Sequence, residues 1–148
     1  NLTFYMSYPT VEFQNLPANS TSADNVLEFT HGALNLPAVD AADTLTVAQL
    51  LSYDGFRKNV TLTANRALTL PSASALVAGL PGAKVGTSLV FNVTTGALSG
   101  SGDVLVTAGA GGSNLGALAV DTLSQAQFRV RLTNVSSGTE AYQVQRLS

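Results

Sequence analysis

The sequence contains no cysteine, which excludes disulfide bonds and thiolate metal sites. It has a single histidine, His31, so a Ser-His-Asp triad would have to use that residue. His31 follows an expected strand and precedes Gly32, a pattern typical of a turn residue, and no G-x-S-x-G motif is present. The sequence therefore favours a protein that is not an enzyme, with no catalytic residue, cofactor or metal.

Charged residues are also scarce, at 11% of the chain against about 25% in a typical soluble domain. The net charge is −2, and the only adjacent basic pair is Arg57-Lys58, so nucleic-acid binding is not expected. A surface poor in charge is easier to desolvate, which favours contacts between subunits. The alternative is an extracellular domain with a Ser/Thr-rich β surface.

Long apolar runs are absent, since no run approaches the ~20 residues that span a bilayer, and no membrane insertion is expected. The chain begins at Asn1 without a signal peptide, so we expect a processed product or an excised domain. Its 148 residues can bury one sizeable core.

Period-two alternation of apolar residues dominates the sequence and predicts β-strands. In the clearest strand, 127–133, Phe128 and Leu132 face one side while Arg129 and Arg131 face the other. A following strand places Tyr142 opposite Leu132, with a three-residue loop, 136–138, whose last residue is a glycine suited to a left-handed conformation. The same argument predicts a second hairpin centred on Asn65, between strands at 59–63 and 67–70. Further strands are expected at 2–8, 11–14, 26–30, 87–94, 103–107 and 116–122.

Two short helices are expected, at Thr46–Leu51 and Ser72–Ala78, with Thr44 or Thr46 as cap of the first. The glycine-rich stretch from 96 to 116 predicts a flexible loop or a wide turn. Together the elements predict an all-β fold, an antiparallel jelly-roll-like β-sandwich with one or two short helices; an immunoglobulin-like sandwich is the alternative. We expect residues 1–39 to form an attachment segment or extra strands, and residues 40–148 to form the sandwich, in one compact domain.

The carboxylates are scattered, which disfavours glycosidase chemistry. The closest pair, Asp40 and Asp43, precedes the first helix, so a capping role is favoured over a calcium site. Asn-x-Ser/Thr sequences at Asn19, Asn59, Asn92 and Asn134, and at Asn1, are candidate glycan acceptors, although abundant Ser and Thr produce such matches by chance. Arg129 and Arg131 are a candidate partner-contact face; the alternative is an ordinary solvated strand face.

Four stretches carry a family resemblance: 43–51, 62–77, 81–93 and 128–135, with the motifs T-L-P-x-A, G-x-x-V-G-x-S and V-x-L-T-N-V. They resemble a β-rich module of virion structural proteins of tailed phages and large double-stranded DNA viruses. The resemblance covers about residues 40–148. It implies a capsid-associated decoration, spike or fibre protein on the virion surface that forms a homo-oligomer, with a trimer favoured. Its partners would be other virion proteins and a host surface glycan or receptor.

Two other functions compete with this one. A carbohydrate-binding module would stack sugars on Tyr5, Tyr8 and Tyr53, with Tyr142 in the core. A hydrolase on a jelly-roll scaffold, dependent on His31, ranks third.

Overall fold

The computed structural model describes residues 32–96 and 102–148. All of these residues belong to one compact unit of the chain, 31–148. The strands expected at 2–8, 11–14 and 26–30 lie outside the described residues. The elements are β1 (Ala33–Asn35), β2 (Asp43–Thr44), α1 (Val47–Ser52), β3 (Gly55–Lys58), β4 (Arg66–Thr69), α2 (Ala73–Gly79), β5 (Ser88–Thr95), β6 (Val104–Thr107), β7 (Gly112–Leu115), β8 (Ala119–Val120), β9 (Gln125–Asn134) and β10 (Ala141–Arg146).

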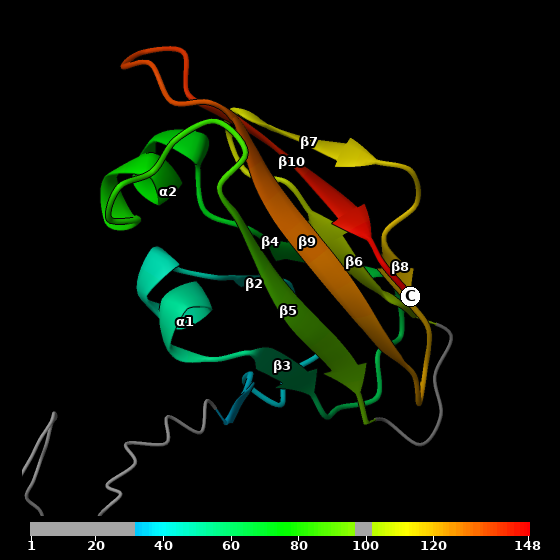
Figure 1. The fold of residues 1–148 in the computed structure, drawn as a ribbon. Coiled ribbons are helices and arrows are strands. Elements are labelled where there is room, and N and C mark those ends of the chain that lie inside the picture. The colour runs from blue at the N-terminus through cyan, green and yellow to red at the C-terminus, as the bar shows by residue number, and fades with distance from the viewer. Residues whose placement is uncertain (1–31, 97–101) are drawn as a thin grey trace, which may run out of the picture. The chain divides into compact units, whose positions relative to one another are not determined.

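The strands form two sheets, and the chain crosses from one to the other after almost every strand (Figure 1). The six-stranded sheet has the order β1-β3-β5-β9-β10-β7, and the four-stranded sheet has the order β2-β4-β6-β8. Strands β1, β3 and β5 are parallel, as are β2, β4 and β6. The strands from β1 to β6 therefore form three stacked coils, each made of one strand of the six-stranded sheet and the next strand of the four-stranded sheet.

Because the coils are stacked, residues at the same position of successive coils lie next to each other across each sheet. Leu34, Phe56 and Val93 are in register across the six-stranded sheet. Thr44, Thr69 and Thr107 are in register across the four-stranded sheet. After the third coil, β8 and β9 run antiparallel to their neighbours β6 and β5, and the hairpin of β9 and β10 completes the fold.

The predicted all-β antiparallel jelly roll is wrong. The fold is mixed α/β, with parallel and antiparallel pairings, and among the described residues five of the eight strand pairings are parallel. The predicted hairpin centred on Asn65 is also wrong, because β3 and β4 lie in different sheets and residues 59–65 connect them. Alternation fixes which side chains share a face, but it does not say which strand is the neighbour.

The β9–β10 hairpin confirms the predicted register, with Leu132 opposite Tyr142. Gly138 has the expected left-handed conformation, at φ 87°. The connection is longer than the predicted three residues, since β9 ends at Asn134 and β10 begins at Ala141, where the register shifts by a bulge. The bulge absorbs the change in loop length without moving the apolar faces.

Both predicted helices are present, displaced by one residue, and each connects a strand of the four-stranded sheet to the next strand of the six-stranded sheet. Thr46 and Gln49 form a reciprocal capping box at the start of α1, and the Ser72 hydroxyl accepts a hydrogen bond from the Ala75 amide at the start of α2. The helices pack closely, because a Cβ at Gly79 would lie 2.5 Å from Val47 Cγ1. They cover one side of the two sheets (Figure 1).

The core lies between the sheets. Phe56, Phe91 and Phe128 come from three neighbouring strands, and their ring centroids are 5.9 Å and 5.6 Å apart. They are at most 1% exposed. Within the stretch predicted as a flexible loop or a wide turn, residues 112–115 instead form a strand, β7, paired in parallel with β10. Gly112 lies against the ring of Tyr142, where a Cβ would come within 2.4 Å.

Candidate interaction surfaces

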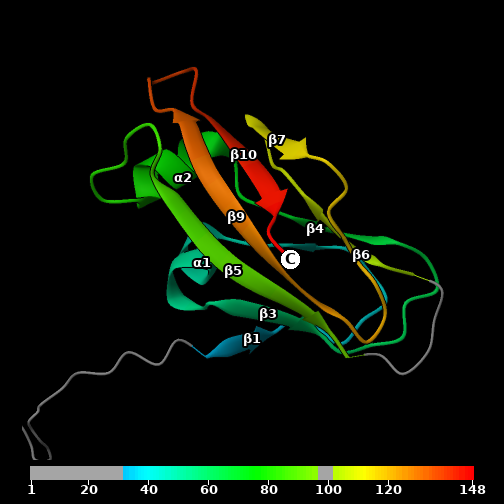
Figure 2. The ribbon, with the colours of Figure 1, turned by 45° about the vertical axis from the view of Figure 1, so that its right-hand side comes forward.

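The outer face of the six-stranded sheet carries the two arginines predicted as a contact face. Figure 2 shows this sheet from β1 through β3, β5, β9 and β10 to β7. Phe128, Val130 and Leu132 are buried, and the alternating residues of β9 face outward. Arg131 stands between Ser88 of β5 and Gln143 of β10, and Arg129 stands between Val90 and Gln145.

A third arginine joins this face through the tertiary structure. Arg57 of β3 is in register with Thr94 of β5, which is in register with Gln125 of β9. Its neighbour Lys58 points the opposite way and is 2% exposed. We call this surface the arginine face; its members are the outward residues Asn35, Arg57, Val90, Asn92, Thr94, Gln125, Gln127, Arg129, Arg131, Gln143, Gln145, Ser88, Ser113 and Leu115. Arg57 is not among the residues predicted for this face, although the alternation of side chains within 55–58 is the signal that separates it from Lys58.

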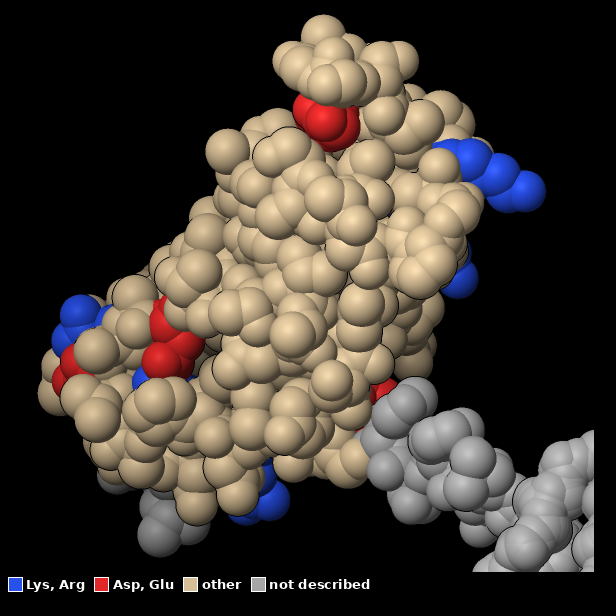
Figure 3. Space-filling view, turned by 90° about the vertical axis from the view of Figure 1, so that its left-hand side faces the viewer, with Lys and Arg blue, Asp and Glu red and all other residues tan. Residues whose placement is uncertain are grey.

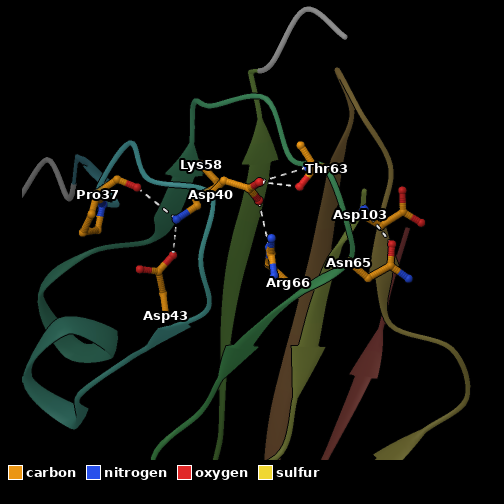
Figure 4. A network of polar contacts seen from close by, with 8 residues as sticks. All are labelled: Pro37, Asp40, Asp43, Lys58, Thr63, Asn65, Arg66 and Asp103. Atoms are coloured by element: carbon orange, nitrogen blue, oxygen red, sulfur yellow. Dashed lines mark hydrogen bonds and ion pairs between the residues drawn. The ribbon is translucent and has the colours of Figure 1, made fainter. Parts of the chain in front are cut away.

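The inward-facing Lys58 belongs to a polar network at the end of the sheets opposite the helices (Figure 4). Its Nζ lies 2.6 Å from Asp43 Oδ2 and 3.0 Å from the carbonyl oxygen of Pro37. The ammonium group thereby ties β3 to β2 and to the loop before it. A buried charge of this kind is tolerated only with such partners.

Asp40 holds the adjacent coil in the same way. It accepts hydrogen bonds from Arg66 Nε at 2.8 Å and from the Thr63 hydroxyl at 2.6 Å. The bond from Arg66, and then that from Thr63, hold the pKa of the Asp40 carboxyl well below its usual range. The predicted capping role of Asp40 and Asp43 is therefore wrong, because both carboxylates bind cations of neighbouring strands and Thr46 caps the helix.

The side of the molecule that carries the helices has a different character. Figure 3 shows it as a broad area with few basic or acidic side chains. No charged residue occurs in α1 or α2, and none between residues 67 and 83. Leu51 of α1 is 42% exposed, and Val85, in the loop after α2, is 60% exposed. We call this surface the helix face.

The other predicted site residues are dispersed. Asn59 is exposed after β3, Asn92 is half-buried on the arginine face, and Asn134 ends β9, where its Oδ1 accepts a hydrogen bond from the Ser136 amide. Tyr142 is in the core, as predicted. Tyr53 is half-buried and packs against the core. His31, Asn1, Asn19, Tyr5 and Tyr8 lie outside the described residues.

The described residues contain no group of three or more His, Cys, Asp or Glu side chains arranged to hold a metal ion. No helix among them is long and apolar enough to cross a membrane. Comparison of the chain with protein-family models, curated proteins and solved structures finds no match.

Proposed function

We propose that this chain is a structural module that carries out no catalysis and assembles with copies of itself through the helix face. The helix face is the observation that supports this proposal. Its two helices carry no charge and expose Leu51, while the nearby loop exposes Val85. Desolvating such a surface costs little, and interface centres are depleted in charged residues.

A second copy is the occupant that the composition favours. The helix face offers no charged pattern by which a different protein could be selected, whereas self-association requires only complementary apolar and small side chains. The resemblance to virion modules supports a homotrimer on the surface of a particle, with other virion proteins as neighbours and host attachment as its outward task.

The carbohydrate-binding alternative, in the form that stacks sugars on aromatic rings, has little support from the described residues. Their five aromatic side chains are either core residues or, for Tyr53, half-buried against the core.

Assembly is tested by measuring the mass of the protein in solution by native mass spectrometry and light scattering at micromolar concentration. We expect an oligomer, and we expect Leu51→Lys to convert it to monomer, because the new ammonium group would be buried without a partner. Val39→Lys is the matched control: Val39 is 58% exposed in the loop between β1 and β2, away from the helices, and should leave the oligomer intact.

A monomeric wild-type protein would contradict the proposal, as would an oligomer that both variants preserve. The virion setting has its own test, in which an antibody against the chain labels purified particles by electron microscopy. Particles that contain no trace of the chain would refute that setting while leaving the assembly result in place.

A further inference from the structure

The arginine face is a strip that follows the length of β5. The guanidinium of Arg131 lies 4.0 Å from the position of a Cβ at Gly86, just before β5. The guanidinium of Arg57 lies 3.1 Å from the same position at Gly96, just after β5. At about 3.3 Å per residue, a strand of this length spans about 26 Å. Cationic groups therefore stand at both ends of the strip, with Arg129 between them on β9.

These arginines are not used by the fold. Lys58 and Arg66 form ion pairs with Asp43 and Asp40, and Arg146 donates hydrogen bonds to the carbonyls of Ser148 and Ala119. In the part of the chain that the structure describes, Arg57, Arg129 and Arg131 have no hydrogen-bond or ion-pair partner. No acidic residue occupies an outward position of the six-stranded sheet.

The side chains between the arginines define the chemistry of a ligand. Gln127, Gln143, Gln145 and Asn92 carry amides, each of which both donates and accepts hydrogen bonds, as sugar hydroxyls also do. The described strip has no aromatic ring on which a nucleic-acid base could stack. Its larger exposed apolar residues, Val90 and Leu115, are 41% and 43% exposed and lie on different strands, so they form no apolar anchor for a protein partner.

We propose that the arginine face binds a linear polysaccharide that carries carboxylate groups, a polyuronate, lying along β5. The planar fork of an arginine matches a carboxylate in a bidentate contact, and the amides between the arginines would bind hydroxyls. The outer face of a sheet holds each sugar from one side only, so affinity comes from several contacts along a polysaccharide chain. The inference goes beyond self-assembly and uses a different face of the molecule.

The test measures binding of the full chain to size-defined polygalacturonate by biolayer interferometry at 50 and 300 mM NaCl. We expect salt-sensitive binding, and no binding to the uncharged polymer dextran. Arg129→Gln/Arg131→Gln should weaken binding several-fold, to at most about 25-fold, since each exposed charged contact contributes up to about fivefold. Arg129→Lys/Arg131→Lys keeps the charge but loses the fork, and should recover only part of the affinity.

The matched control is Lys84→Gln/Arg146→Gln, which removes the same charge from residues outside the arginine face, and should bind within about twofold of wild type. A wild-type protein that does not bind would overturn the inference. So would equal losses in the control, full binding by the lysine variant, or binding to dextran sulfate or single-stranded DNA that is as tight as binding to polygalacturonate. Oligomeric state measured on the same samples separates this result from the assembly proposal.

Discussion

The hydroxyl of Tyr142 offers the sharpest test of how the two sheets are held together. The residue lies in β10 of the six-stranded sheet and is 1% exposed. Its hydroxyl donates a hydrogen bond to the carbonyl of Pro71 at 2.9 Å and accepts one from the Gly109 amide at 2.7 Å. Pro71 follows β4 and Gly109 follows β6, so one atom joins β10 to the ends of two strands of the other sheet.

Tyr142→Phe removes this hydroxyl and keeps the ring. Each hydrogen bond contributes about 0.5–1.5 kcal/mol net, and a buried group left without a partner costs about 1–3 kcal/mol. We therefore expect the free energy of unfolding to fall by about 2–3 kcal/mol. For a domain of this size that lowers Tm by about 6–15 °C.

Urea unfolding followed by circular dichroism measures this loss, which should appear in the midpoint with an unchanged m-value. Tyr53→Phe is the matched control. Tyr53 is half-buried, and its hydroxyl has no partner among the described residues, so its loss should cost less than about 0.5 kcal/mol. Equal effects of the two substitutions would refute the reasoning.

The same hydroxyl gives a pH dependence. Burial raises the pKa of Tyr142, and the hydrogen bond from the Gly109 amide opposes part of this rise. In the folded state the Tyr142 hydroxyl then keeps its proton at pH values where the unfolded state loses it. The stability that the protonated hydroxyl provides is therefore complete below pH ~10 and is lost as pH rises above that value. Tyr142→Phe should flatten the loss of stability above pH ~10; an unchanged slope would contradict this assignment.

Three further predictions concern the loops and the polar network. Lys58→Met should lower the free energy of unfolding, measured in urea, by about 2–4 kcal/mol, because Asp43 loses its partner. The double variant Lys58→Met/Asp43→Leu should recover most of that loss, and no recovery would argue against a contribution of the ion pair. Leu123→Gly should raise stability by about 0.5–1 kcal/mol, since Leu123 has φ 53° and is 60% exposed, and a lower Tm would disprove strain there. The pKa of Asp40 is lowered in the folded state, so the stability that this carboxylate provides is present above pH ~4 and is lost as pH falls further. Asp40→Asn should therefore make the acid limb of a curve of Tm against pH shallower than in the wild type. A curve parallel to that of the wild type would count against this role of Asp40.

Sequence reasoning succeeded where the information is local. The faces of β5 and β9, the two helices, and the cap at Thr46 follow from side-chain alternation and capping chemistry within a few residues. The register of Leu132 with Tyr142 follows because the two strands are adjacent in sequence and their apolar faces must coincide. The same alternation placed Arg129 and Arg131 on one outward face.

The architecture depended on contacts that are not local. Strands β3 and β4 are separated by only seven residues, 59–65, and yet they belong to different sheets. Each of them pairs with the equivalent strand of the preceding and following coil, and not with the strand that is next in sequence. Parallel pairing of β3 with β5 joins residues 37 positions apart, such as Gly55 and Asn92, and no turn signal marks such a pair. This is why an antiparallel fold was predicted in error.

The candidate surfaces divide in the same way. The sequence alone determined a chain poor in charge, with strands whose polar and apolar faces are separated and with two uncharged helices. The tertiary structure alone decided that Arg57 joins Arg129 and Arg131, that Lys58 turns inward to Asp43, and that the helices lie together on one side. The physical reason is that alternation fixes the direction of a side chain, whereas its neighbours are fixed by which strands pair, and pairing is settled by burial of the whole core.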